Sequence, residues 1–302
     1  MVLKDASPDL AKFGLGSAQL GMVYGKFNQS GQPDLFQAEL ILRKAKKLGF
    51  SLIDTASQYG SSESVLGQLG QAWEGIPLVT KTPSFNTGQI SRTQAEQIKQ
   101  AFHTSLSRLR ISRVRGLLVH HAPDLLAPGG EYIYDMLRHL KSEGLVEQIG
   151  VSVYDAEAAD CVLEKYSLDL IQVPINIFDK RLIDSGALER WSRAGLEIHA
   201  RSAFLQGLLL AEPSQLPEQF RSVAPTLSRF HADCVTCGVS PKSAALHYLL
   251  QLNPISKILI GIDSEQQLTE IFSAFPERLD MQWDSYRIEN VDILNPAHWK
   301  KS

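Results

Sequence analysis

Four polar residues follow short apolar segments of the chain, and their types suggest proton transfer at a carbonyl or alcohol group. Asp54, Lys81 and His120 each end such a segment, and Tyr59 lies five residues after Asp54. A tyrosine phenol has an ordinary pKa of about 10, but a nearby ammonium favours the phenolate and lowers that pKa. A carboxylate holds the lysine in place and charged, and a histidine polarises the substrate oxygen. The set predicts a tuned proton donor for a carbonyl, or an acceptor for an alcohol.

These residues need a scaffold that brings strand ends together, and the hydrophobic pattern predicts one. Short apolar runs alternate with amphipathic runs, and Leu117–His120 is apolar almost throughout, as expected of a strand buried on both faces. The predicted strands are Phe13–Ala18, Phe50–Asp54, Pro77–Lys81, Arg115–His120, Glu147–Ser152, Asp169–Val173, Glu197–Ser202 and Lys257–Gly261.

The intervening runs have helical periodicity and helix-end signals. Pro33-Asp34 begins one helix that Gly49 ends, and Thr93 with Glu96 predicts a capping box for the next. Further helices are expected over Glu131–Lys141, after Asp155, and over Lys180–Ala194, Lys242–Leu252 and Gln266–Phe275.

Eight strand-helix units in one chain predict a single-domain α/β fold, a (β/α)8 TIM barrel over residues 1–302. An insertion near 213–238 and a C-terminal tail from 280 fall outside the repeat. An open doubly wound sheet is the alternative, and the lack of a G-x-G-x-x-G after the first strand weighs against it. In such a barrel the active site lies at the carboxyl ends of the strands, where the four polar residues are predicted.

Composition excludes several classes of protein. Of the 302 residues 44% are hydrophobic and 21% charged, and 30 basic against 33 acidic residues give a net charge of -3. We therefore expect no nucleic acid or membrane partner. The N-terminal residues lack a secretory pattern, the apolar runs are too short to cross a bilayer, and Cys161, Cys234 and Cys237 are expected to be reduced thiols, which indicates a cytoplasmic protein. No metal site is expected, because the adjacent His120 and His121 would point to opposite faces of a strand.

Several segments, in order, resemble the aldo-keto reductase superfamily: FGLGSAQLG, LIDTASQYG, VTKT, LLVHHAPD, IGVS and RSAFLQGLL. The resemblance covers nearly the whole chain, and its most specific part is Asp-Thr-Ala-x-x-Tyr-Gly at Asp54–Gly60. It implies a (β/α)8 barrel that binds NADP(H), with NAD(H) as the other candidate, and reduces an aldehyde or ketone to an alcohol. The expected partner is a small-molecule carbonyl substrate, and the expected state is a monomer or small homo-oligomer.

The resemblance also assigns roles to residues. Tyr59 would be the general acid, Lys81 would lower its pKa, and Asp54 would pair with Lys81. His120 would orient the carbonyl, with His121 left open as the alternative. The cofactor-binding residues would be Ser152 and Gln172 at the carboxamide, Arg201 stacked on the nicotinamide ring, Ser202, Phe204 and Gly207 at the pyrophosphate, and Gly261 near the adenosine phosphate.

Three questions stay open at this point. The segment after the last strand carries Asp263 and Glu265 and no basic residue, so we expect weak discrimination of NADP over NAD. A Schiff-base lyase or aldolase using Lys81, or a cofactor-binding sensor with slow turnover, is an alternative function. Tyr24, Trp73 and Phe178 could line a substrate pocket or pack in the core.

Overall fold

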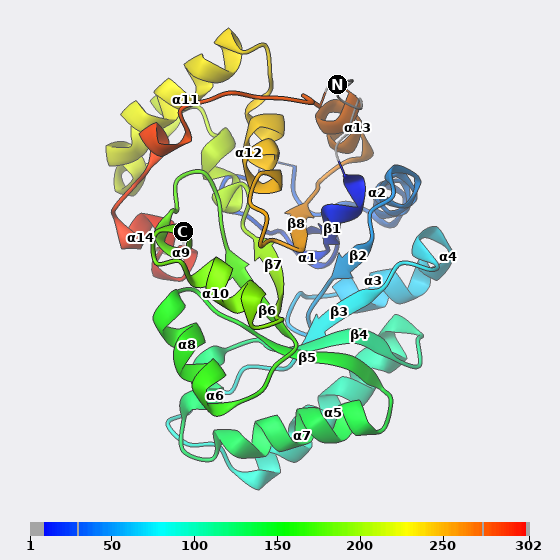
Figure 1. Cartoon of the computed structure of the whole chain (residues 1–302). Helices are drawn as coiled ribbons and strands as arrows, with labels where there is room; N and C mark the ends of the chain where they lie inside the picture. The colour runs from blue at the N-terminus through cyan, green and yellow to red at the C-terminus, as the bar shows by residue number, and fades with distance from the viewer. Residues whose placement is uncertain (1–8, 29, 274, 300–302) are drawn as a thin grey trace, which may run out of the picture.

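A computed structural model describes residues 9–28, 30–273 and 275–299, and its strands form a closed parallel barrel in the order β1 to β8 (Figure 1). The (β/α)8 prediction is confirmed, with strand ends within two residues of those predicted. The residues before Asp9, where the absence of a secretory pattern was predicted, lie outside the described part. The strands are β1 (Phe13–Gly16), β2 (Leu52–Asp54), β3 (Leu78–Lys81), β4 (Val114–Val119), β5 (Val146–Ser152), β6 (Leu170–Pro174), β7 (Glu197–Arg201) and β8 (Lys257–Gly261).

Apolar side chains fill the barrel and cover its outside. A small cluster from five strands is separate from the main core and comprises Leu52, Val79, Leu118, Leu170 and Leu259. Inward-pointing side chains of this kind fill a barrel of eight strands, so it is packed rather than hollow. The main core lies between the strands and the surrounding helices.

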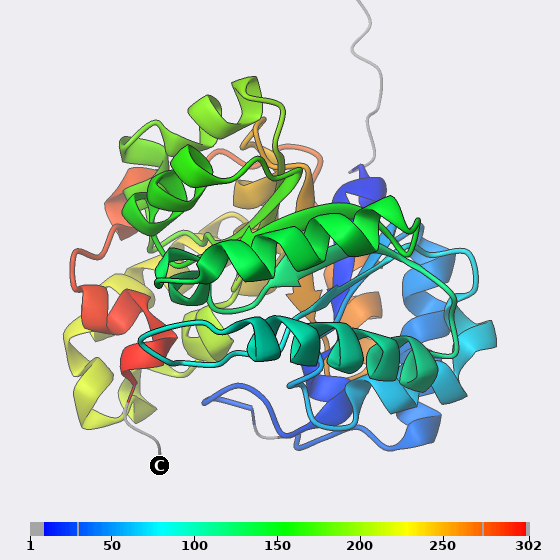
Figure 2. The same cartoon turned by 90° about the horizontal axis from the view of Figure 1, so that it is seen from below.

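Helices connect successive strands and lie around the barrel. The longest helix, α5, lies side by side with α7 on the outside of the barrel (Figure 2). The α-helices are α1 (Ala18–Gly21), α2 (Leu35–Leu48), α3 (Ser62–Gln68), α4 (Gly70–Trp73), α5 (Arg92–Leu109), α6 (Ala122–Leu126), α7 (Gly130–Ser142), α8 (Ala156–Lys165), α9 (Arg181–Asp184), α10 (Ala187–Arg193), α11 (Ala224–Thr236), α12 (Pro241–Leu250), α13 (Glu265–Ser273) and α14 (Val291–Leu294). The 3-10 helices are η1 (Leu10–Lys12), η2 (Leu205–Leu210), η3 (Pro213–Gln215), η4 (Glu218–Val223), η5 (Trp283–Tyr286) and η6 (Pro296–His298).

Helix ends follow local chemistry, in one case from residues other than those predicted. As predicted, Asp34 caps α2 and Gly49, at φ 85°, ends it. The capping box of α5 is Ser91 with Gln94, not Thr93 with Glu96. Both pairs have the required spacing, but the helix begins two residues earlier than predicted, so the Ser91 side chain reaches the free backbone amides.

The segment predicted as one helix over Lys180–Ala194 forms two helices in the structure. Lys180–Ala194 forms α9 and α10, because Gly186 between them has a φ of 64° and interrupts the helical backbone.

The buried Lys180 lies over the Tyr248 ring, with its Nζ 4.2 Å from the ring centroid.

The segment after η2 and the C-terminal tail pack against each other. η3, η4 and α11 follow η2, and the tail runs past α11 to α14 beside α9 (Figure 1). Tyr286 of the tail is buried, lies 5.3 Å from the Phe230 ring of α11 and donates a hydrogen bond to Asp233. Arg287 forms an ion pair with Asp184 of α9.

The three cysteines are free, as predicted, and Cys234 is buried in α11 while Cys161 and Cys237 are exposed. Over residues 9–28, 30–273 and 275–299, no helix is long and apolar enough to cross a membrane. Within the same ranges no group of three acidic, histidine or cysteine side chains could hold a metal ion.

Candidate active site

A cavity of about 630 Å³ opens at the carboxyl ends of the strands. Its volume is within the range of small-molecule and cofactor sites. Asp54, Tyr59, Gln172 and Arg201 line the end over the barrel, and the wall continues along the loops after β7 and β8. These four predicted site residues, which are far apart in the sequence, therefore meet at one cavity, whereas Lys81 and His120 lie outside its lining.

Asp54, Lys81 and Gln172 form a buried hydrogen-bonded group under this cavity. The Lys81 Nζ lies 2.7 Å from Asp54 Oδ2 and donates to the Thr55 carbonyl at 2.9 Å. Gln172 donates from Nε2 to the other Asp54 oxygen at 2.7 Å. Burial lowers the pKa of Lys81, and the Asp54 carboxylate opposes this shift. The Lys81–Asp54 pair is net neutral, and together with Gln172 it joins β2, β3 and β6.

Tyr59 is positioned by close contact between two backbone segments. A side chain at Gly21 would place its Cβ 2.0 Å from the Tyr59 carbonyl oxygen, and one at Gly60 would place its Cβ 2.2 Å from the Gly21 carbonyl oxygen. Neither distance is possible for a real Cβ, so both positions need glycine. Gly60 also has a φ of 55°, which glycine adopts without strain.

The Tyr59 ring lies between Lys81 and His120. Its centroid is 4.9 Å from Lys81 Nζ and 5.8 Å from the His120 ring centroid, with the two rings nearly perpendicular at 84°. Tyr24 lies next to it, at 6.5 Å between ring centroids, and also lines the cavity. Of the three aromatic residues left open by the sequence, Trp73 and Phe178 are instead buried in the core.

The direction of the Tyr59 pKa differs from the sequence expectation. Burial, and then the negative charge of Asp54, raise the pKa of Tyr59 well above its usual value, while Arg201 opposes them. Lys81 does not reverse this shift, because its charge is already balanced by Asp54 at 2.7 Å. The phenol therefore stays protonated around neutral pH, as a proton donor must.

His120 is neutral and faces the tyrosine, whereas His121 is bonded elsewhere. Burial, with the positive charges of Lys81 and Arg201, lowers the pKa of His120 to about 3. Its Nδ1 is buried and has no hydrogen-bond partner among the residues that the structure describes. The His121 Nδ1 instead lies 2.9 Å from Asp124 Oδ1 on α6. The geometry favours His120 as the histidine of the site.

Gln172 has a buried polar atom that the protein leaves unused. Its Nε2 donates to Asp54, but its Oε1 has no partner within residues 9–28, 30–273 and 275–299, and the residue is 1% exposed. Such an acceptor fits the amide N–H of a nicotinamide carboxamide. Ser152 is its neighbour in the β5–β6 register and is buried beside the cavity, outside its lining.

The loop after β7 has an unusual backbone. Ser202, Leu205 and Gln206 have φ values of 60°, 47° and 51°, and Gly207 has 90°. A positive φ strains the backbone of any residue other than glycine, and such strained residues cluster at functional sites. Ser202, Phe204 and Gly207 line the cavity, as expected of residues that contact a ligand along this wall.

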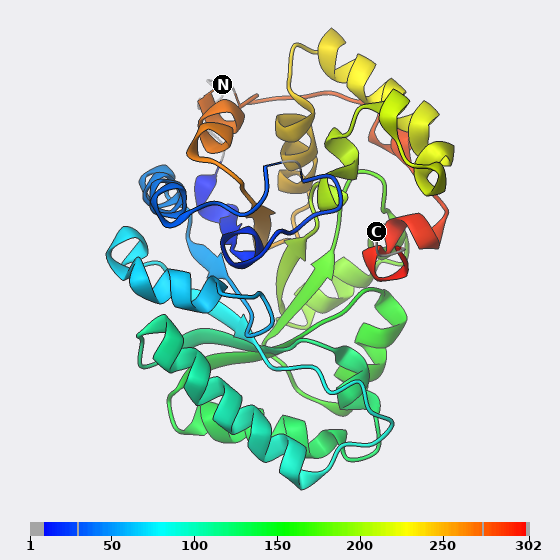
Figure 3. The same cartoon turned by 180° about the vertical axis from the view of Figure 1, so that it is seen from behind.

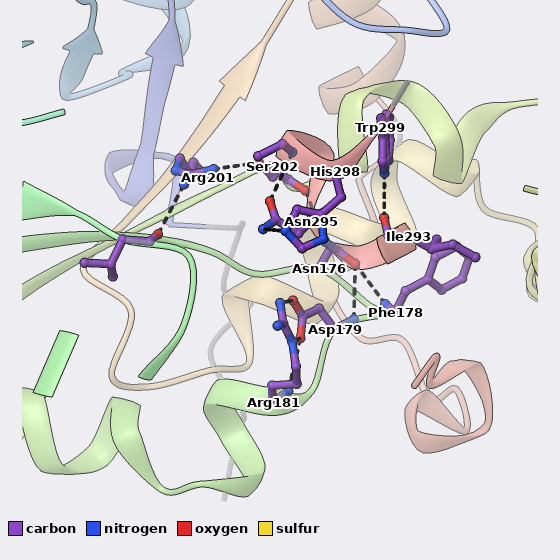
Figure 4. Close-up of polar contacts among 12 residues, drawn as sticks. Asn176, Phe178, Asp179, Arg181, Arg201, Ser202, Ile293, Asn295, His298 and Trp299 are labelled. Carbon is purple, nitrogen blue, oxygen red and sulfur yellow. Dashed lines mark hydrogen bonds and ion pairs between the residues drawn. The ribbon is translucent and has the colours of Figure 1, made fainter. Parts of the chain in front are cut away.

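Arg201 is held in place by neutral groups (Figure 4). Its guanidinium donates to Ser202 Oγ at 3.3 Å and to the Val153 carbonyl at 3.2 Å. The guanidinium carbon also lies 4.4 Å from the centroid of the Tyr154 ring. Sequence reasoning missed Tyr154, because nothing local marks a tyrosine after β5 as a support for β7.

The far end of the cavity lies at β8. A Cβ on Gly261 would be 2.0 Å from Gln19 Nε2, so glycine lets the Gln19 side chain lie against β8. Asp263 lines the cavity and accepts hydrogen bonds from Asn28 at 3.3 Å and Gln267 at 3.4 Å. Glu265 lies instead 3.4 Å from Lys44 of α2.

A basic residue that the sequence did not indicate faces the same end. Lys242 of α12 lines the cavity with Asp263, and its charge opposes the rise in the pKa of Asp263 caused by burial. It was missed because it precedes β8 in the chain, whereas the expected position follows that strand.

Residues 22–28, which follow α1 and which we call the strap, run toward η2 (Figure 3), and Tyr24, Phe27 and Asn28 of this segment line the cavity. The Phe27 amide donates to the Gln206 carbonyl at 3.4 Å. The Phe27 ring lies 5.4 Å from Phe220 of η4 and 6.4 Å from Trp299 of the tail. The strap thus forms part of the cavity wall and contacts three separate segments, which are η2, η4 and the C-terminal tail.

A (β/α)8 barrel with a paired lysine and carboxylate, a protonated tyrosine and a neutral histidine at its mouth defines a class of barrel oxidoreductase. The sequence profile of the Aldo/keto reductase family matches residues 12–293, and the chain belongs to this family.

Characterised relatives and solved structures agree with this assignment. L-galactose dehydrogenase of Arabidopsis thaliana is 26% identical over 305 residues, covering 94% of this chain and 90% of the relative. NADH-specific methylglyoxal reductase of Escherichia coli is 26% identical, covering 88% and 90%. The structure of a glycerol dehydrogenase from Gluconobacter oxydans has a TM-score of 0.72 at 22% identity, covering 99% and 95%, which shows the shared fold.

Proposed function

We propose that this protein reduces a small aldehyde or ketone to an alcohol, using a nicotinamide dinucleotide as the hydride donor. The observation that carries the proposal is the protonated Tyr59 phenol beside the neutral His120, above the Lys81–Asp54 pair. Membership of the Aldo/keto reductase family supports it.

In this reaction Tyr59 donates its proton to the carbonyl oxygen as negative charge develops there. The positive charge of Arg201, which opposes the rise in the Tyr59 pKa, stabilises the phenolate that remains, and Lys81 lies against the tyrosine ring. His120 positions the substrate carbonyl oxygen, which accepts a hydrogen bond from the N–H of the neutral imidazole. The product alcohol then leaves, and Tyr59 recovers its proton from solvent.

The residues around the cavity fit a nicotinamide cofactor, which would supply hydride to the carbonyl carbon when bound. Gln172 and Ser152 would hold the carboxamide, with the unused Gln172 Oε1 as acceptor. Arg201 would lie against the ring. Ser202, Phe204 and Gly207 would contact the pyrophosphate, and Gly261 would border the adenosine end.

We propose weak discrimination between NADPH and NADH. At the far end Asp263 would repel a 2′-phosphate, whereas Lys242 would attract it, and both line the cavity. A relative described as NADH-specific supports a role for NADH in this part of the family.

The substrate we propose is a short polar carbonyl compound, such as a sugar-derived or short-chain aldehyde. The named relatives act on compounds of this kind. We also propose a cytoplasmic protein that acts as a monomer or small homo-oligomer.

Burial of Lys81 weighs against a lyase that forms a Schiff base. A lowered lysine pKa would favour a nucleophilic amine. However, this side chain is 1% exposed and its Nζ is bonded to Asp54 and Thr55, so a substrate carbonyl cannot reach it without breaking both contacts.

Fluorescence titration of the pure protein with NADPH and NADH tests the proposal, followed by assay of cofactor oxidation with methylglyoxal as a probe aldehyde. We expect saturable binding of both cofactors and aldehyde-dependent oxidation. Binding without turnover on a panel of short aldehydes would favour the sensor alternative, and a borohydride-trapped adduct on Lys81 would favour the lyase.

A further inference from the structure

Arg201 is a positive charge in the cavity without a negative partner. Its contacts are a hydroxyl, a carbonyl and an aromatic ring, and no carboxylate pairs with it in the part of the chain that the structure describes. Lys81, the other cation nearby, is neutralised by Asp54 at 2.7 Å, and His120 is uncharged. This end of the cavity therefore has a net charge of about +1.

The register places Arg201 directly above the carboxamide position. Gln172 of β6 pairs with His199, and Pro174 pairs with Arg201, so Arg201 is two residues closer to the barrel mouth than the level of Gln172. Side chains two apart on a strand point the same way. A nicotinamide ring whose carboxamide bonded Gln172 would lie next to the Arg201 guanidinium.

The two states of a nicotinamide ring differ by one positive charge. The reduced ring is neutral and the oxidised ring is cationic, while the phosphates are the same in both. A cation fixed close to the ring in a partly buried site therefore penalises the oxidised state alone. The Tyr154 ring against the guanidinium keeps it from turning away.

We propose that Arg201 makes this cavity bind the reduced cofactor more tightly than the oxidised cofactor, so that oxidised cofactor is released readily after each reduction. This inference rests on the proposed function. It gives the enzyme a bias toward reduction that an aromatic residue at this position would not provide.

The ratio of dissociation constants for oxidised and reduced cofactor tests the proposal. Calorimetric titrations with NADH and NAD+, and with NADPH and NADP+, are made on the wild type and on two matched variants. Arg201→Gln keeps a planar hydrogen-bonding group and removes the positive charge. Arg201→Lys keeps the positive charge and removes the planar guanidinium group. We expect the oxidised-to-reduced ratio to fall about tenfold or more in Arg201→Gln and to be kept in Arg201→Lys.

An unchanged ratio in Arg201→Gln, or an equal fall in both variants, would overturn the role of charge while leaving the proposed function intact. Loss of activity restricted to carboxylate-bearing aldehydes, with an unchanged ratio, would assign Arg201 to substrate binding and also overturn it. Failure of the wild type to bind any of the four nucleotides would overturn both proposals. Arg201→Met replaces Arg201→Gln if the latter is not folded by circular dichroism.

Discussion

At the scale of single residues, the site depends on which charges are balanced and which are not. Lys81 and Asp54 cancel, so the positive charge that acts across the mouth comes from Arg201. Burial and the Asp54 charge nevertheless keep Tyr59 protonated against the effect of Arg201, and burial with the nearby positive charges keeps His120 neutral. A proton donor and a neutral hydrogen-bonding group are what reduction of a carbonyl requires.

Tyr59→Phe removes the proposed proton donor and leaves the ring. We expect kcat for aldehyde reduction to fall by about 10²- to 10⁴-fold, the usual contribution of a positioned general acid. Cofactor dissociation constants, measured by fluorescence, should stay within about twofold of the wild type, a change of only about 0.4 kcal/mol. Turnover like that of the wild type would remove Tyr59 from its assigned role. Tyr24→Phe, which changes the neighbouring phenol of the cavity, is the matched control.

The balance of Asp263 and Lys242 sets cofactor preference. In the wild type we expect kcat/KM for NADPH and NADH to differ by less than about 100-fold, or ~2.7 kcal/mol. Asp263→Asn should shift the ratio toward NADPH, and Lys242→Gln should shift it toward NADH, because only one of the two charges remains to act on the 2′-phosphate. Shifts in the same direction in both variants would contradict this assignment.

At the scale of elements, loops that cross between strands place the reactive groups. Tyr59 follows β2 but is held by the backbone of α1, and Arg201 ends β7 but is supported by Val153 and Tyr154, which follow β5. The strap between α1 and α2 bonds η2 on one side and Asp263 on the other. Each site residue thus depends on an element other than its own.

Gly21→Ala tests the contact between α1 and the Tyr59 loop. The added Cβ has no space, so the loop must shift, and we expect a loss of about 2 kcal/mol in unfolding free energy with a large loss of kcat. Gly70→Ala in α4, where nothing lies within 4 Å of a Cβ, is the control and should be neutral or slightly stabilising. Urea unfolding and the reductase assay measure both effects. Equal behaviour of the two variants would contradict the close-packing explanation.

At the scale of the whole molecule, polar contacts also hold the barrel at the end opposite the site. Glu197, at the start of β7, lies 2.8 Å from His199 Nε2, 2.7 Å from Arg115 of β4 and 2.9 Å from Gln148 of β5. The hydrogen bond with His199, with those from its other partners, lowers the pKa of Glu197 from 4.5 to about 2. This carboxylate therefore links strands around the barrel.

Glu197 gives the fold a pH dependence whose sign follows from this shift. A carboxylate with a lowered folded pKa stabilises the protein above its unfolded pKa, and that stability is lost as pH falls from about 4.5 toward 2. Glu197→Gln should cost about 2 kcal/mol of unfolding free energy at pH 7, and the difference from wild type should narrow at pH 3. Urea unfolding at both pH values measures this.

Glu147→Gln is the control for that experiment. Glu147 lies 3.9 Å from the same Arg115 but is nearly half exposed, so its loss should cost little at either pH. A Glu197→Gln difference that is equal at pH 7 and pH 3 would show that the carboxylate charge is not the source of its contribution.

The alternation of strands and helices, and hence the barrel, could be predicted from the sequence, because burial on both faces and helical periodicity are local patterns. Asp54, Lys81 and His120 could be predicted as well, since strand ends meet at one mouth. The contact of Asp54 with Gln172, 118 residues away, and the position of Lys242 in the cavity wall became visible in the folded molecule alone. The same is true of the direction of the Tyr59 pKa and of the absence of a negative partner for Arg201 among the described residues. These depend on burial and on charges brought together from separate strands, which no spacing along the chain reveals.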